Sequence, residues 1–352
     1  MRYLPTSRLT PGMALGQDIY DGAGRLLLGR HILLTEEQIS NLEFLGFPGA
    51  YVDDEFSRGI EIQQIVSPEV RRQALKIVYD LFHTDMRKQE PSEAELKLRK
   101  TVESVVDDVI CNGDIMCNIM EIKSYDDYIY YHSIHVGILS VVVGARLGLS
   151  HDKLCQLAAA ALLHDIGKRF IDHDIVRGGK AHRSEKEQEV YRSHPKIGAE
   201  YLRETCRFPA DVYEGIMEHH ECYNGEGYPL GKKGGEIHLF ARIIRIADCY
   251  DAKVSAFPAQ KSLSPSEALE YVMALGDRWF DPDIVAVFAR KVAAYPIGCE
   301  VELSNGQHAV VARNFENFPL RPLVRVVETG EMLNMRDDEK ARAVTVGRLI
   351  VR

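Results

Sequence analysis

Two histidine-led motifs constrain this chain more than any other feature. The first is His164-Asp165-Ile166-Gly167-Lys168, and the second begins at His219-His220 and runs through a glycine-rich turn to Tyr228-Pro229. Neutral imidazoles and carboxylates are the ligands that suit borderline divalent ions such as iron, manganese and zinc. A fold that uses both motifs must therefore bring two segments that are distant in the sequence to one metal site.

Further candidate ligands surround these motifs. Asp248 stands between apolar residues, where a carboxylate is rarely buried unless it is paired or bound to a metal. The candidate ligands are His132, His164, Asp165, His194, His219, His220 and Asp248. This set is too large for one ion. It predicts two metals, which lie about 3.5–4 Å apart in typical sites, with Asp165 bridging them and a water activated for attack at phosphorus.

Composition places the chain among soluble globular proteins. Its 352 residues are 45% hydrophobic, which is enough for two or three domains. The longest apolar run, at residues 157–163, is too short to span a membrane, and the first residues lack a signal-peptide core, so a cytoplasmic location is expected. The seven cysteines form no C-x-x-C pair, which argues against disulfides. A net charge of −9 disfavours DNA as a partner.

Hydrophobic periodicity divides the chain into three expected parts. Residues 1–64 predict a small α+β domain, with a hairpin around a glycine turn and a helix capped by Thr35 and Gln38. Residues 65–295 read as helix after helix, one of them over residues 190–202, so a mostly α protein with a central all-helical domain is expected. In residues 296–352, runs of alternating apolar and polar residues flank Asn305-Gly306, which predicts a small C-terminal β module.

The order of these motifs resembles the HD-GYP branch of the HD phosphohydrolase superfamily. The resemblance covers about residues 124–290. It rests on His132, His164-Asp165-Ile166-Gly167-Lys168, His194-Pro195, His219-His220-Glu221, Gly225-x-Gly227-Tyr228-Pro229 and Ala247-Asp248-x-x-Asp251-Ala252. It implies an all-helical phosphodiesterase of bacterial signalling that acts on cyclic di-GMP, with a two- or three-metal centre of iron or manganese type. Residues 9–13 resemble, more weakly, a small domain often found ahead of such catalytic domains.

The resemblance also suggests roles for single residues. One metal would be held by His132, His164, Asp165 and Asp248, and the other by Asp165, His194, His219 and His220. Lys168 would act beside Asp165 in catalysis, with its ammonium against a phosphate oxygen or the leaving group. Asp251 would hold either a ligand or Lys168 in place. Substrate contacts are expected from Lys168, Gly225, Gly227, Tyr228, Pro229 and Lys261, although Tyr228-Pro229 fits a purely structural turn equally well.

Two places depart from the family pattern. Some members have a glutamate that binds a third metal four residues before the first histidine, but this chain has Tyr128 there. A phenol is a poor ligand at neutral pH, so two metals are expected. After Asp251-Ala252 the usual phosphate-binding arginine, a tyrosine and a basic residue are replaced by Phe257, Ala259 and Gln260. Lys261 is a substitute displaced by one residue, and one lost charge-assisted contact costs about 1.5–3 kcal/mol.

The leading prediction is hydrolysis of cyclic di-GMP to linear pGpG by a hydroxide that bridges two metals, and whether the reaction continues to GMP is left open. Two alternatives stay open. The altered segment at residues 254–261 also fits a weak or inactive protein that binds cyclic di-GMP or a partner such as a GGDEF-type diguanylate cyclase. It equally fits a hydrolase of another phosphodiester or nucleotide. A homodimer formed through a helix at residues 69–88 is a further expectation.

Overall fold

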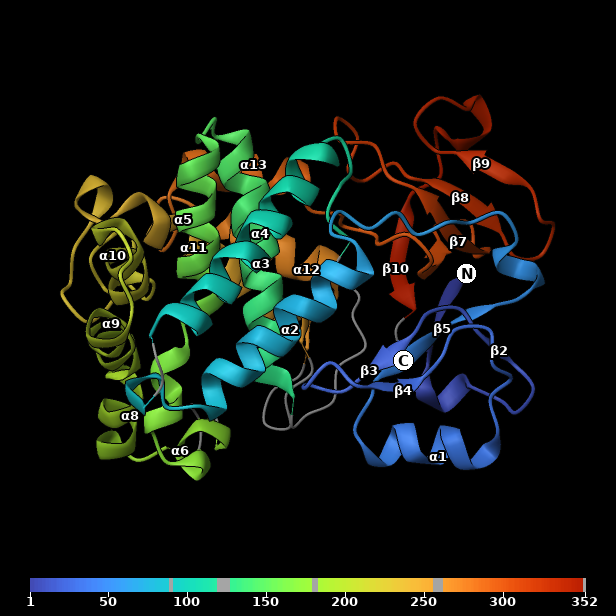
Figure 1. Cartoon of the computed structure of the whole chain (residues 1–352). Coiled ribbons are helices and arrows are strands. Elements are labelled where there is room, and N and C mark those ends of the chain that lie inside the picture. The colour runs from blue at the N-terminus through green and yellow to red at the C-terminus, as the bar shows by residue number, and fades with distance from the viewer. Residues whose placement is uncertain (89–90, 119–126, 179–182, 256–261, 351–352) are drawn as a thin grey trace.

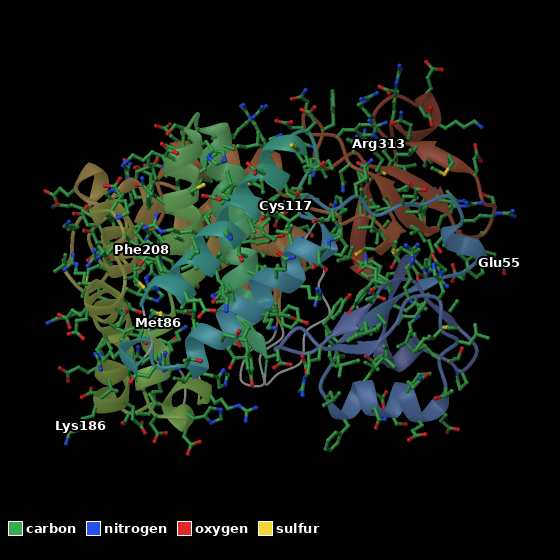
Figure 2. All side chains as sticks on the ribbon, viewed as in Figure 1. Glu55, Met86, Cys117, Lys186, Phe208 and Arg313 are labelled. Atoms are coloured by element: carbon green, nitrogen blue, oxygen red, sulfur yellow. The ribbon has the colours of Figure 1, made fainter. Side chains whose placement is uncertain are left out.

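The computed structural model of the chain describes residues 1–88, 91–118, 127–178, 183–255 and 262–350. A helical part and a β part lie side by side, and strands from both ends of the chain meet in the β part (Figure 1). Figure 2 shows Cys117 where the two parts meet, Phe208 in the helical part and Arg313 in the β part. The expected division into central helices and flanking strands is confirmed.

The helical part forms around one apolar core. Its helices are α2 (Pro68–His83), α3 (Pro91–Cys111), α4 (Tyr128–Arg146), α5 (His151–Leu163), α6 (His173–Arg177), α8 (Glu185–Arg192), α9 (His194–Thr205), α10 (Ala210–Glu218), α11 (Leu239–Val254), α12 (Pro265–Ala274) and α13 (Pro282–Lys291). A 3₁₀ turn, η4 (Ile166–Phe170), follows α5. The buried apolar side chains form one cluster that runs from Ile65 to Ala294.

Helix α4 is the central element of this core. It packs against α2, α3, α5, α11 and α13, so it carries apolar residues all round rather than on one face. By length and composition α4 could cross a membrane, but 78% of its 18-residue apolar window is buried inside the structure. The apolar sequence of α4 therefore follows from its place at the centre of the bundle.

The helix expected over residues 190–202 is two helices. Helix α8 ends at Arg192, and α9 begins at His194 with Pro195 in its first turn. Inside a helix, proline lacks a donor and clashes with the preceding turn, whereas in the first turn it causes neither problem. The single-helix prediction was therefore wrong, and the break places His194 at a helix start.

Both ends of the chain build the β part. The first sheet is antiparallel in the order β1 (Arg2–Pro5), β5 (Gly49–Asp53), β2 (Ala14–Leu15), and the expected hairpin pairs β3 (Ile19–Tyr20) with β4 (Leu26–Leu28). Helix α1 (Glu36–Phe44) begins with the expected capping box of Thr35 and Gln38. The second sheet is antiparallel in the order β10 (Val346–Ile350), β6 (Glu300–Leu303), β7 (His308–Arg313), β8 (Leu323–Val326), β9 (Met332–Asn334).

The N-terminal and C-terminal segments share an apolar core. Leu4 of the first sheet and Val301 of the second belong to the same buried cluster. Arg2 joins the two segments, with Nε 2.7 Å from Asp54 and Nη1 3.2 Å from Glu300. A small sheet buries little surface by itself, so the two segments support each other. The domain boundaries near residues 64 and 295 stay a prediction, and the shared core adds that residues 1–64 and 296–352 pack together.

Candidate metal centre

The predicted metal ligands come from separate elements of the helical part. His132 lies in α4, His164 ends α5, Asp165 precedes η4, His194 opens α9, His219 and His220 follow α10, and Asp248 lies in α11. Packing of α5 against α4 and α10, and of α11 against α4, brings these elements together. His220 is partly buried, and the other six residues are buried. The core therefore determines where the polar cluster forms.

The backbone orients three of the histidines. The Nδ1 atoms of His164, His194 and His219 lie 2.7, 2.7 and 2.6 Å from the carbonyl oxygen three residues earlier in the chain. A carbonyl oxygen can only accept, so each Nδ1 carries the proton, and the lone pair of the neutral ring is on Nε2. Local helix geometry thus selects the tautomer in which Nε2 can bind a metal.

Asp165 lies between two groups of these nitrogens. Its Oδ2 is 3.4 Å from Nε2 of His164 and 3.8 Å from Nε2 of His132. Its Oδ1 is 3.2 Å from Nε2 of His194 and 3.9 Å from Nε2 of His219. The ligand atoms form two close groups, His132-His164-Asp165 and Asp165-His194-His219-His220. One carboxylate facing two groups with different oxygens has the arrangement of a bridging ligand.

Several of these atoms lack a hydrogen-bond partner. Among the described residues, His164 Nε2, Asp165 Oδ1 and His220 Nε2 are buried and unpartnered. Nε2 of His194 and Nε2 of His219 lie 3.4 Å apart although both carry lone pairs. Leaving a polar atom buried and unsatisfied costs about 1–3 kcal/mol. Divalent cations would satisfy these atoms, so the donor set fits a pair of iron-, manganese- or zinc-type ions.

Electrostatics keep most of these ligands in the forms that bind metals. Burial, together with neighbouring imidazoles, lowers the pKa of His219 and His220 well below the usual histidine value, so both are neutral at pH 7. Burial acts to raise the pKa of Asp165, but His164 and Lys168 outweigh it and hold that pKa well below its usual range. Metal ligands must be deprotonated, and these residues already are.

His132 is the exception, and it leads to a prediction about pH. Burial lowers the pKa of His132, but the carboxylates of Asp248 and Asp251 outweigh burial and raise it to about 9. Below that pH the metal-free ring holds a proton that a metal must displace. Metal affinity should therefore rise with pH, about tenfold per unit between pH 7 and 9. Calorimetry of Mn²⁺ binding in buffers of different ionisation enthalpy should detect the released proton, and an absence of proton release would contradict this prediction.

Residues 117–284 match a family model described as an HD domain. The match identifies an HD domain in this part of the chain. A cyclic di-GMP phosphodiesterase of Pseudomonas aeruginosa is 32% identical over 226 residues, which are 64% of this chain and 54% of that protein. A cyclic di-GMP phosphodiesterase response regulator of Xanthomonas campestris is 39% identical over 151 residues, which are 42% of this chain and 39% of that protein. The chain spans about half the length of these relatives, or less.

A solved structure supports the fold of the HD domain. The HDG"Y"P protein of Bdellovibrio bacteriovorus aligns with a TM-score of 0.51 at 17% identity, covering 82% of this chain and 97% of that one. At this identity the likeness concerns the fold alone. Together with the relatives, the family match confirms the HD-GYP resemblance. The chain contains an HD domain with two His/Asp clusters consistent with a binuclear metal site.

Asp251 holds a histidine of the candidate metal cluster in place through a hydrogen bond. Its Oδ2 lies 2.7 Å from Nδ1 of His132, and its Oδ1 lies 2.7 Å from Nδ1 of His135. Of the two partners expected for Asp251, the structure shows the ligand His132. His135, which is not among the candidate ligands, is buried beside it. Its spacing of three residues from His132, on one face of α4, was the available signal.

Replacing Asp251 with asparagine should weaken metal binding by about 10–100-fold, the usual effect of losing a group that orients a ligand. The amide keeps the volume but removes the charge and one acceptor oxygen, so it cannot hold both imidazole rings. Competition with a metal-indicator dye would measure the affinity. Asp174→Asn is the matched control, because the Asp174 side chain is 98% exposed. Equal affinity in the Asp251 and Asp174 variants would contradict the supporting role.

Lys168 of the HD domain contacts the shared carboxylate. Its Nζ donates a hydrogen bond to Oδ2 of Asp165 and lies 5.3 Å from the ring centroid of Tyr191. Burial lowers the pKa of Lys168, but the charge of Asp165 outweighs burial and raises that pKa above its usual value. The ammonium therefore stays charged beside the candidate metals. Its contact with a phosphate oxygen or leaving group stays a prediction.

Tyr128 stacks on the first histidine of the site. Its ring centroid is 5.2 Å from that of His132, and its hydroxyl lies 3.4 Å from Nδ1 of the same ring. Burial raises the pKa of Tyr128 well above the usual value for tyrosine, and the nearby carboxylates add to this. The phenol therefore stays protonated, which disfavours it as a ligand for a third metal and supports the prediction of two.

The glycine-rich loop of the HD domain packs directly on the cluster. Tyr228, which a cis peptide bond joins to Pro229, stacks on His220 with ring centroids 4.8 Å apart. A Cβ at Gly227 would overlap the backbone of residues 221–222. The missing side chain of Gly227 thus makes room for the loop itself, and a substrate contact by Gly227 stays a prediction.

Glu221 and Gly225 shape the same loop. Oε1 of Glu221 accepts hydrogen bonds from the backbone N–H groups of Leu230 and Gly231, at 2.6 and 3.1 Å. Gly225 has a φ of +86°, a conformation that glycine adopts without strain. These contacts explain why the loop holds Tyr228 over the cluster. A substrate contact by Gly225 stays a prediction.

The structure adds one cation near the cluster, Arg245, that the sequence analysis missed. Arg245 lies on α11 with Nη1 3.7 Å from Oδ2 of Asp248. Its spacing of three residues from Asp248 places both on one helix face, which was the available signal. The replaced phosphate-binding segment, with Phe257 and Lys261, lies outside the described residues, so its proposed consequences stay predictions.

Proposed function

We propose that this protein is a metal-dependent phosphodiesterase that hydrolyses cyclic di-GMP to linear pGpG. The observation that carries the proposal is the pair of His/Asp clusters that share Asp165 and contain buried ligand atoms without hydrogen-bond partners. Two ions of iron or manganese type bound there would polarise a phosphoryl oxygen and activate water at neutral pH. The chain's own residues supply the rest of the site.

The exposed side of the cluster defines how a substrate would reach it. Lys168, His220 and Asp248 keep 12%, 13% and 12% of their side chains exposed, whereas His132 and His164 are buried. A phosphodiester would therefore approach from the side of Lys168. The ammonium of Lys168, held in place by Asp165, puts a fixed positive charge where negative charge develops on the leaving group or a phosphate oxygen.

The choice of cyclic di-GMP rests on the relatives. Both the Pseudomonas aeruginosa and the Xanthomonas campestris proteins are described as cyclic di-GMP phosphodiesterases. An anionic dinucleotide also matches a metal cluster with a lysine beside it, because a protein with net charge −9 needs such a local positive centre to hold phosphates. The substrate is proposed for the domain shared with these relatives.

The test is turnover by protein purified without oxygen and loaded with iron or manganese. Metal analysis should give two ions per chain, and chromatography should show cyclic di-GMP converted to pGpG, with GMP as a slower product. Cyclic di-AMP and mixed cyclic dinucleotides serve as comparison substrates. Three ions per chain would overturn the two-metal assignment.

The remaining outcomes separate the alternatives. Turnover of another cyclic dinucleotide, without turnover of cyclic di-GMP, would retain the hydrolase and replace the substrate. No turnover at full metal occupancy would contradict the enzyme proposal and favour a protein that only binds the dinucleotide or a partner.

A further inference from the structure

Arg245 is a partly buried cation beside the metal cluster, and the donors of its guanidinium are poorly satisfied. Its side chain is 16% exposed. Nη1 lies 3.5 Å from Nδ1 of His220 and 3.7 Å from Oδ2 of Asp248, and Nη2 lies 3.9 Å from Sγ of Cys222. Nε is buried without a hydrogen-bond partner among the described residues. A guanidinium has five N–H donors, so most of this donor capacity is unused.

The surroundings of Arg245 hold it in position without neutralising it. Its Cζ lies 6.0 Å from the ring centroid of Trp279 and 5.9 Å from that of Phe280. Asp248 is the carboxylate that Arg245 faces, and their separation of 3.7 Å exceeds a charge-assisted hydrogen bond, which is about 2.7–2.9 Å. Asp248 also faces His132, with Oδ1 3.2 Å from Nε2, so its charge is shared with the cluster.

The position of Arg245 matches that of a phosphate-binding group. It contacts His220 and Asp248, which lie on the exposed side of the cluster together with Lys168. The planar guanidinium of Arg245 can donate two parallel hydrogen bonds to the oxygens of a phosphate. Asp248 does not accept such a pair of hydrogen bonds, because its nearest oxygen is 3.7 Å from Nη1. Lys168 and Arg245 contact the two cluster carboxylates, Asp165 and Asp248 respectively, so both cations border the reacting position.

We propose that Arg245 binds a non-bridging phosphate oxygen of the cyclic dinucleotide. This inference rests on the proposed function and extends it with a residue that determines substrate affinity. It also supplies a cation to a chain whose sequence has Phe257 and Gln260 where the family pattern has positively charged residues.

The test compares Arg245→Met and Arg245→Lys with Lys253→Met in full-length, metal-loaded protein. Lys253 is the matched control, because it lies on the same helix but packs against Tyr271. Arg245→Met should raise KM for cyclic di-GMP by roughly ten- to a hundredfold, the usual effect of losing a charge-assisted phosphate contact, while Arg245→Lys should recover part of the loss. Metal content should stay at the wild-type value, and Lys253→Met should leave KM unchanged.

A second measurement separates this inference from the proposed function. Calorimetry of inorganic phosphate binding to the same metal-loaded proteins needs no turnover, and Arg245→Met should weaken phosphate binding by a similar factor. If the wild type binds phosphate but does not hydrolyse cyclic di-GMP, the function fails and the phosphate titration still decides the role of Arg245. Unchanged KM and phosphate affinity in Arg245→Met would overturn the inference. Loss of metal from that variant would also overturn it, because Arg245 would then position His220 and Asp248 instead.

Discussion

Asp165→Asn is expected to abolish both metal binding and turnover. Asp165 faces two groups of imidazole nitrogens with its two oxygens, so the amide replaces an anionic bridging ligand by a neutral one whose NH₂ group cannot bind a cation. The rate of cyclic di-GMP hydrolysis should fall by at least roughly 10²–10³, the scale of losing preorganised stabilisation of charge in a transition state. Metal analysis and chromatography of the products would measure both effects.

The control for this variant is Asp152→Asn, which changes an exposed aspartate in the first turn of α5. It makes the same chemical change at the start of the helix that leads to Asp165, without touching the cluster, so metal content and rate should match those of the wild type. Two bound metals and full turnover in Asp165→Asn would refute the bridging role.

Gly167→Ala is expected to destabilise the protein and to displace one of the two ligand groups. A Cβ at Gly167 would overlap the carbonyl oxygen of His194 and would lie 2.8 Å from the backbone nitrogen of Gly198. Helix α9 would have to move away from η4, and His194, whose Nε2 is 3.2 Å from Oδ1 of Asp165, would move with it. Overpacking at a rigid backbone contact costs about 1–3 kcal/mol, and more where nothing can yield.

Urea unfolding would measure the stability of this variant, and metal analysis would count its ions, with one ion expected in the variant and two in the wild type. Gly29→Ala is the matched control, because nothing lies within 4 Å of a Cβ added there. The explanation fails if Gly167→Ala unfolds at the wild-type urea concentration with both metals bound.

The reason for a glycine at position 167 cannot be deduced from the sequence. The sequence places this glycine in the His164-to-Lys168 motif, but its neighbours in the chain do not explain why a side chain is excluded. The explanation is the close approach of η4 to α9, two elements that pack against each other. The same holds for Gly227, because the backbone of its own loop occupies the space that a side chain would fill.

Local features were predictable because their causes are local. The capping box of Thr35 and Gln38 and the hairpin turn at Asn305-Gly306 depend on residues within a few positions of each other, and both occur as expected. The helix break at Ser193 was missed although its cause is also local. The apolar pattern of residues 190–202 continues across the break, whereas Pro195, in the first turn of α9, marks the start of a new helix.

The sequence by itself determined the helical class of the central region, the set of candidate ligands and the family to which they point, since periodicity and motif order survive without coordinates. Tertiary packing alone decided that Asp165 faces two groups of histidines, that Asp251 holds His132 and His135 together, and that Arg245 reaches the exposed side of the cluster. It also decided that the two chain ends share a core. These features depend on contacts between segments far apart in the chain, and such contacts leave no periodic pattern in the sequence.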